Sequence, residues 1–124
     1  MMKYVLAGAL ALAPVGAAQA QTMTVATFLG KVDALKKKGP MALFSSDIKV
    51  LKGEVQTSAK QLRAEQAAAQ KAGRKPATCM PEKATTDQKE LLAYFEAIPP
   101  AQRGASVKQA FASLMRKKYP CPTA

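Results

Sequence analysis

The placement of two cysteines constrains this chain more than any other feature of its sequence. Cys79 lies in the segment PATCMPEK, and Cys121 lies between two prolines in KKYPCPTA. Two cysteines can form one intramolecular disulfide if the fold brings their Cα atoms to within about 7 Å of each other. A disulfide also persists only in an oxidising compartment, so the question of pairing begins with where the chain resides.

The N-terminus has the three parts of a secretory signal peptide. One positive charge, at Lys3, precedes an apolar run over residues 5–13, and small residues follow up to the Ala-Gln-Ala that ends at Ala20. This ending matches the signal for cleavage. The alternative is a membrane anchor, which needs about 20 consecutive apolar residues, and Pro14 and Gly16 interrupt this run. We therefore expect residues 1–20 to be cleaved and the product to be exported, with a bacterial periplasm as its destination.

The remainder, residues 21–124, is long enough for one domain, and we expect no membrane span in it. Four of its segments repeat apolar side chains at the three- and four-residue spacing of a helix. Alternating runs of β-branched residues, which are typical of strands, are missing. We expect helices over about 24–38, 47–71, 86–98 and 106–119. The sequence thus predicts an all-α fold, a small bundle of four main helices with one long second helix and one disulfide.

Each predicted helix has a capping residue and one apolar face. The expected N-caps are Thr24, the cluster Ser45–Asp47, Thr85 or Thr86, and Ser106. The expected buried residues are Val25, Phe28, Leu29, Val32 and Leu35 in the first helix, Ile48, Leu51, Val55, Ala59, Leu62 and Ala69 in the second, Leu91, Leu92, Phe95 and Ile98 in the third, and Val107, Ala110, Phe111, Leu114, Met115 and Tyr119 in the fourth. The alanine-rich last turns of the second helix have little bulk to bury, so we expect them to project beyond the core.

The helix order brings the two cysteines together. Cys79 precedes the third predicted helix and Cys121 follows the fourth. Two antiparallel helices with a short connection place the start of one beside the end of the other, so we expect a Cys79–Cys121 disulfide. In the chain-entropy model, such a bond contributes roughly 4 kcal/mol. Two free thiols are the alternative, and a redox-active pair is disfavoured because no C-x-x-C spacing is present.

Residues with catalytic chemistry are sparse. The chain has no histidine, which excludes histidine-based triads and leaves the usual His/Cys metal sites almost without ligands. Ser46 and Lys49 fit the S-x-x-K pair of penicillin-recognising enzymes, yet the K-T-G and S-D-N partner motifs are missing. A helix cap followed by a surface lysine explains that stretch. We expect no catalytic residues, no cofactor and no metal.

The positive net charge indicates what kind of partner the chain binds. The formal charge is +11, and removal of Lys3 with the signal peptide leaves +10. A charge of this size favours acidic partners, such as an acidic protein, an anionic lipid or a cell-wall polymer. Nucleic acid is not expected, because aromatic residues suited to base stacking are not interleaved with the basic ones. The clusters Lys36–Lys38 and Arg116–Lys118 fall at predicted helix ends, where they complement the helix dipole.

Around the cysteines the chain resembles a known family. The segment CMPEKATTDQKELLAYFEAIPP and the later SVKQAFASLMRKKYPCP resemble the C-terminal half of the Rap/Tai immunity proteins of bacterial type VI secretion. The shared elements are a Cys-x-Pro at Cys79, a proline-containing turn at Pro99–Pro100, and the aromatic-Pro-Cys ending at Cys121. The resemblance covers residues 78–122.

The resemblance implies a small, exported, all-helical protein that binds and blocks a peptidoglycan-cleaving amidase toxin, and it also implies a possible homodimer. On this interpretation the chain is a non-catalytic inhibitor. We expect partner contacts from the basic loop and from the later turn, namely from Arg74, Lys75, Lys83, Gln102 and Arg103. The alternative hypothesis is a basic periplasmic adaptor or chaperone-like protein that holds acidic or unfolded clients.

Overall fold

The computed structural model describes residues 23–84 and 86–122, and four α-helices account for most of them. These helices are α1 (Val25–Lys38), α2 (Ser46–Lys71), α3 (Gln88–Glu96) and α4 (Val107–Lys118). Two 3-10 helices, η2 (Gly39–Phe44) and η3 (Pro100–Gln102), lie in the connections. The predicted all-α bundle with a long second helix is confirmed. The predicted signal peptide lies outside the described residues.

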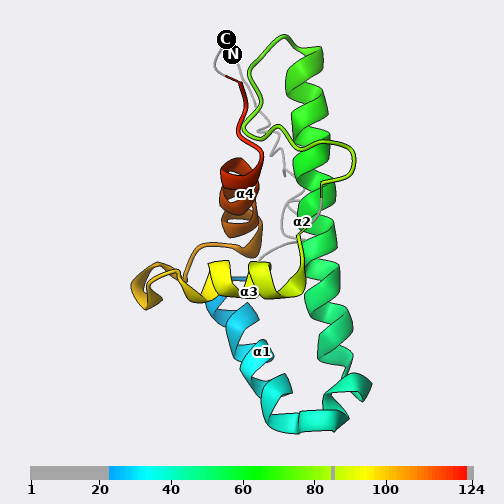
Figure 1. The fold of residues 1–124 in the computed structure, drawn as a ribbon, viewed down its shortest axis with the longest axis vertical. Coiled ribbons are helices and arrows are strands. Elements are labelled where there is room, and N and C mark those ends of the chain that lie inside the picture. Colours follow the sequence, from blue (N-terminus) through cyan, green and yellow to red (C-terminus); the bar gives the residue numbers. More distant parts are fainter. Residues whose placement is uncertain (1–22, 85, 123–124) are drawn as a thin grey trace, which may run out of the picture.

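The helix α2 runs along the length of the molecule, and α1 and α4 pack beside it (Figure 1). The helices α1 and α4 lie roughly end to end along α2, with their N-termini meeting near the middle. From there α1 runs to the end where η2 leads into α2, and α4 runs to the opposite end. The short helix α3 crosses near the junction and contacts both α1 and α4. Within the described ranges, no helix has the length and hydropathy that crossing a bilayer requires.

Backbone hydrogen bonds join the starts of α1 and α4. The first amide groups of a helix have no partner inside the helix. In α1, the Val25 N–H donates to the carbonyl of Ala105 at 2.9 Å, and the Ala26 N–H donates to the carbonyl of Arg103 at 2.9 Å. In return, the Val107 N–H donates to the carbonyl of Met23 at 2.9 Å. The turn before α4 is thereby fixed to the start of α1.

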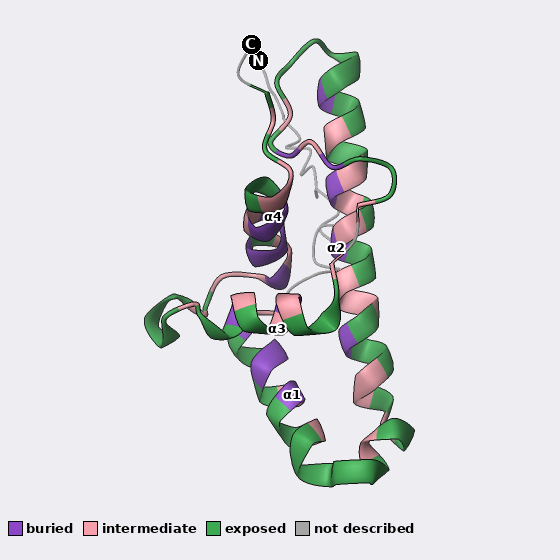
Figure 2. Cartoon of the chain, in the orientation of Figure 1, coloured by how far each residue is buried: buried purple, intermediate pink, exposed green. Residues whose placement is uncertain are grey.

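The core lies where the four helices meet (Figure 2). The rings of Phe28 and Phe95 pack edge to face at its centre, with their centroids 5.3 Å apart. Most of the predicted apolar positions are buried. The exceptions are half-buried, and they are Leu35, Ile48, Val55, Ala59, Leu92, Ile98 and Tyr119. The polar residue Ser58 of α2 is also fully buried, which the apolar pattern did not predict.

Three of the four predicted N-caps are confirmed. The side chains of Thr24, Ser45 and Ser106 each accept a hydrogen bond from an N–H group in the first turn of their helix. The prediction of Thr85 or Thr86 for α3 is wrong, because Asp87 caps this helix through a 2.7 Å hydrogen bond from the Glu90 N–H. An aspartate caps at least as well as a threonine, and its negative charge also interacts favourably with the helix dipole.

The end of α2 is as predicted. Gly73 has a φ of +72°, and the Arg74 N–H donates to the Ala69 carbonyl at 2.8 Å, which is the hydrogen bonding of a Schellman motif. Leu62 is the last α2 residue in the core cluster, so the final turns do extend beyond it. Ala69, in these final turns, is buried as expected. The loop that follows α2 turns back along the helix (Figure 1).

The two phenylalanines Phe95 and Phe44 give a matched test of the core. Phe95 is 0% exposed and Phe44 is 84% exposed. We predict that Phe95→Ala lowers the free energy of unfolding by about 3–5 kcal/mol, because it leaves a cavity against Phe28. Phe44→Ala should change it by less than about 0.5 kcal/mol. Urea unfolding with the disulfide intact measures both, and equal losses would contradict this description of the core.

Candidate functional site

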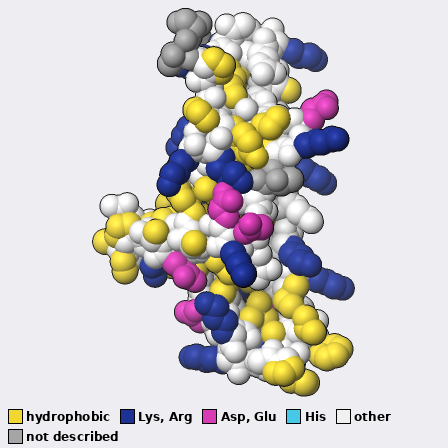
Figure 3. All heavy atoms as spheres, viewed as in Figure 1, with side chains coloured by type: hydrophobic (Ala, Val, Ile, Leu, Met, Phe, Trp, Pro, Cys, Tyr) yellow, Lys and Arg dark blue, Asp and Glu magenta, His cyan; other side chains and the backbone are white. Residues whose placement is uncertain are grey.

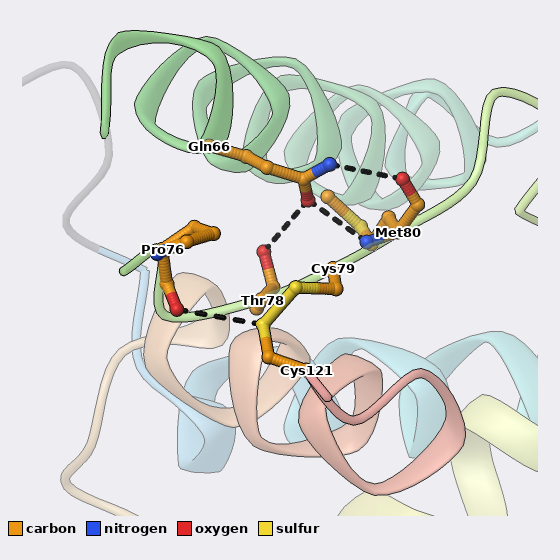
Figure 4. The surroundings of a disulfide bond; sticks show 6 residues. All are labelled: Gln66, Pro76, Thr78, Cys79, Met80 and Cys121. Atoms are coloured by element: carbon orange, nitrogen blue, oxygen red, sulfur yellow. Dashed lines mark hydrogen bonds between the residues drawn. A yellow bond between two sulfur atoms is a disulfide. The ribbon is translucent and has the colours of Figure 1, made fainter. Parts of the chain in front are cut away.

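A disulfide between Cys79 and Cys121 closes one end of the molecule. Their Cα atoms are 5.0 Å apart across a sequence separation of 42 residues, and neither cysteine is free. The predicted pairing is confirmed. The bond joins the loop after α2 to the segment after α4 (Figure 4), and we call residues 74–84 and 119–122 together the closed end. The Cys121 sulfur also lies 3.5 Å from the Pro76 carbonyl oxygen, a contact only, since a disulfide sulfur has no proton to donate.

The side chain of Gln66 holds the loop against α2 (Figure 4). Its Oε1 accepts the Met80 N–H at 2.8 Å, and its Nε2 donates to the Met80 carbonyl at 3.0 Å. The Thr78 hydroxyl donates to the same Oε1 at 3.3 Å. Thr78 and Met80, on either side of Cys79, are both buried. One glutamine therefore satisfies both backbone groups of Met80, in a segment that has no regular secondary structure.

The basic residues predicted to contact a partner lie on this loop. Arg74, Lys75 and Lys83 are all exposed, and within the described residues none of the three forms an ion pair. A fourth basic residue, Arg63 of α2, donates from Nη1 to the Pro81 carbonyl at 3.0 Å. The loop therefore presents positive charge from a backbone that Gln66, Arg63 and the disulfide hold in place.

The second predicted contact region is the turn that contains η3. This turn projects sideways from the bundle, away from α2 (Figure 1). Gln102 is exposed there. Arg103 is half-buried instead, and its guanidinium donates from Nε to the Ile98 carbonyl at 2.8 Å and from Nη2 to the Glu96 carbonyl at 2.9 Å. Arg103 thus stabilises the turn, and those two nitrogens are already used in doing so.

A shallow hollow lies beside this turn. Gln102 lines it together with Tyr94 and Ile98 on one side and Gln109 and Ser113 of α4 on the other. The turn and the hollow give this face a ridge next to a depression. The loop at the closed end lies apart from them (Figure 1). The structure therefore places the predicted contacts in two separate regions.

In the described part of the chain, the candidate catalytic and metal-binding side chains do not form a site. No group of three or more His, Cys, Asp or Glu side chains there could hold a metal ion. Ser46 and Lys49 are both exposed on the first turn of α2, and no hydrogen bond joins their side chains. Burial raises the pKa of the half-buried Glu54 above that of a free glutamate.

Comparison of the chain with protein-family models, with curated proteins and with solved structures finds no match.

Gln66 and Gln70, on the same helix, test the role of the glutamine contact. We predict that Gln66→Ala lowers the free energy of unfolding by about 1–3 kcal/mol, because it leaves buried polar groups at Thr78 and Met80 without partners. Gln70 is exposed, so Gln70→Ala should be close to neutral. Thermal and urea unfolding of the oxidised proteins measure both. If the two variants were equally stable, Gln66 would not hold the loop.

Proposed function

We propose that this chain is an exported, non-catalytic binding protein that inhibits a peptidoglycan-cleaving amidase toxin, as the Rap/Tai immunity proteins that it resembles do. The observation that supports this proposal most is the fixed geometry of the helix pair α3 and α4. The Cys79–Cys121 disulfide joins the loop that precedes α3 to the segment that follows α4. The turn between the two helices is held by Arg103 and by the start of α1.

A fixed surface suits an inhibitor for a thermodynamic reason. Ordering a loose loop or side chain on binding costs free energy that is then lost from the affinity. Here the turn around η3 projects from the bundle (Figure 1), yet its backbone is anchored at both ends. Such a ridge can enter a cleft in a partner without further ordering. On this proposal, the turn blocks the toxin's substrate cleft by occupying it.

The charge of the chain supports an acidic partner surface. The formal charge is +11 over the whole sequence, and Arg74, Lys75 and Lys83 present part of it from the closed end. Complementary charge accelerates association. Salt weakens this effect, because at 0.1 M ionic strength charges more than about 10 Å apart are largely screened from each other. On this proposal, the turn fits the toxin's cleft, and the basic loop attracts the toxin's acidic surface.

Protection from a toxin tests the proposal directly. The protein is co-expressed, with its own leader, with each candidate wall-degrading amidase from its own genome targeted to the periplasm. We predict that one of them is neutralised and that the pair co-purifies. The triple variant Arg74→Glu, Lys75→Glu and Lys83→Glu should slow association by about tenfold or more at low salt. Intact mass of the recovered protein establishes where its N-terminus lies.

A matched variant separates a binding defect from a folding defect. Leu43→Ser with Phe44→Ser alters exposed residues far from the closed end and should leave protection unchanged. If no amidase is bound or neutralised, the immunity proposal fails. Capture of acidic or unfolded periplasmic proteins in its place would support the adaptor hypothesis.

A further inference from the structure

The connection between α1 and α2 exposes large apolar side chains. None of the six residues of η2 is buried. Met41 is 66% exposed, Leu43 is 80% exposed and Phe44 is 84% exposed. We call these three residues the apolar tip. Hydrophobic side chains gather at this end of the molecule in Figure 3, opposite the closed end.

The fold itself does not require these side chains. The helix α1 ends at Gly39, whose φ of +57° and N–H bond to the Lys36 carbonyl provide the cap. Pro40 stands at the start of η2, and Ser45 caps α2. Polar residues at the apolar tip would leave all of these interactions intact. Exposed apolar side chains that form a contiguous patch mark an interaction site.

Lysines surround the apolar tip. The segment 36–52 contains five of them and a single carboxylate, Asp47, for a formal charge of +4. Asp47 already lies 3.5 Å from the ammonium of Lys31. Lys37, Lys49 and Lys52 are exposed and form no ion pair among the described residues. Basic side chains lie near the exposed apolar groups on both flanks in Figure 3.

We infer that the apolar tip docks on the surface of an anionic lipid bilayer. Met, Leu and Phe side chains can enter the boundary between headgroups and acyl chains, while lysines beside them contact the lipid phosphates. Long lysine side chains reach the headgroup layer even when their α-carbons lie deeper. The contact is peripheral, since no described helix can span a bilayer.

Charge also decides against a second copy of the chain as the occupant. In a two-fold dimer the same surface patch lies on both sides of the interface. Two apolar tips packed together would place one +4 segment against another, and like charges across an interface oppose association. An anionic bilayer provides both the apolar interior and the opposite charge.

Binding to vesicles tests the inference. The oxidised protein, as recovered from the periplasm, is sedimented with phosphatidylcholine vesicles with and without phosphatidylglycerol. We predict binding to the anionic vesicles that falls as salt rises, and at least about tenfold weaker binding to the neutral ones. Leu43→Ser with Phe44→Ser should weaken binding by about tenfold or more, because each buried side chain of this size contributes at least that factor.

A pair of charge variants shows whether the position of the charge matters. Lys49→Glu with Lys52→Glu should abolish binding to the anionic vesicles. Arg74→Glu with Lys75→Glu changes the net charge equally at the opposite end and should retain most of the binding. Equal losses in the two variants would mean that only the total charge attracts the protein, and this result would overturn the proposal.

Two further outcomes would overturn it. One is full vesicle binding by the Leu43→Ser, Phe44→Ser variant, which would place the contact elsewhere on the chain. The other is a dimer in analytical ultracentrifugation that the same variant dissolves, which would make a second copy the occupant. The toxin-protection assay does not use the apolar tip, so the two proposals can fail separately.

Discussion

The Cys79–Cys121 disulfide is the constraint on which the closed end depends. The loop between α2 and α3 has no regular secondary structure from Arg74 to Ala84, so no helix or sheet ladder fixes its course. The disulfide joins this loop to the chain after α4, and Gln66 satisfies the backbone of Met80 next to it. The covalent bond limits where the loop can go, and the glutamine then determines how it lies on α2.

The turn between α3 and α4 is held in place without a covalent bond. The first amides of α1 need acceptors, and the carbonyls of Arg103 and Ala105 provide them. The guanidinium of Arg103 in turn satisfies carbonyls at the end of α3. The projecting turn is therefore stabilised by groups that would be unsatisfied without it. This explains how a segment with little buried surface keeps a defined shape, which the proposed inhibitory role requires.

Sequence patterns predicted the parts of the fold that depend on local interactions. The apolar spacing located the four helices, and Thr24, Ser45 and Ser106 were identified as caps because capping is local. The cysteines were paired correctly, although the antiparallel arrangement of the third and fourth helices from which the pairing was argued is not observed, because α3 lies across α4 (Figure 1). The prediction of Thr85 or Thr86 as the cap of α3 failed, because the neighbouring Asp87 can form the same hydrogen bond and the residue at which the helix begins decides which of them does so.

Features that depend on tertiary contacts were not predicted. Gln66 lies in an alanine-rich stretch and looks like any exposed polar residue until the loop folds back on it. Arg103 looked like a surface cation, and only the structure shows its carbonyl partners. The exposure of Leu43 and Phe44 was not predicted either, because large apolar residues are usually buried.

Hydrogen exchange measures directly whether the disulfide orders the closed end. Amide exchange is compared between the oxidised protein and the double variant Cys79→Ala with Cys121→Ala, under conditions in which both remain helical. We expect protection to be lost at Met80 and Ala84, the loop amides that donate hydrogen bonds, while the amides of α1 and the first turns of α4 retain theirs. Unchanged protection in residues 74–84 of the double variant would contradict it.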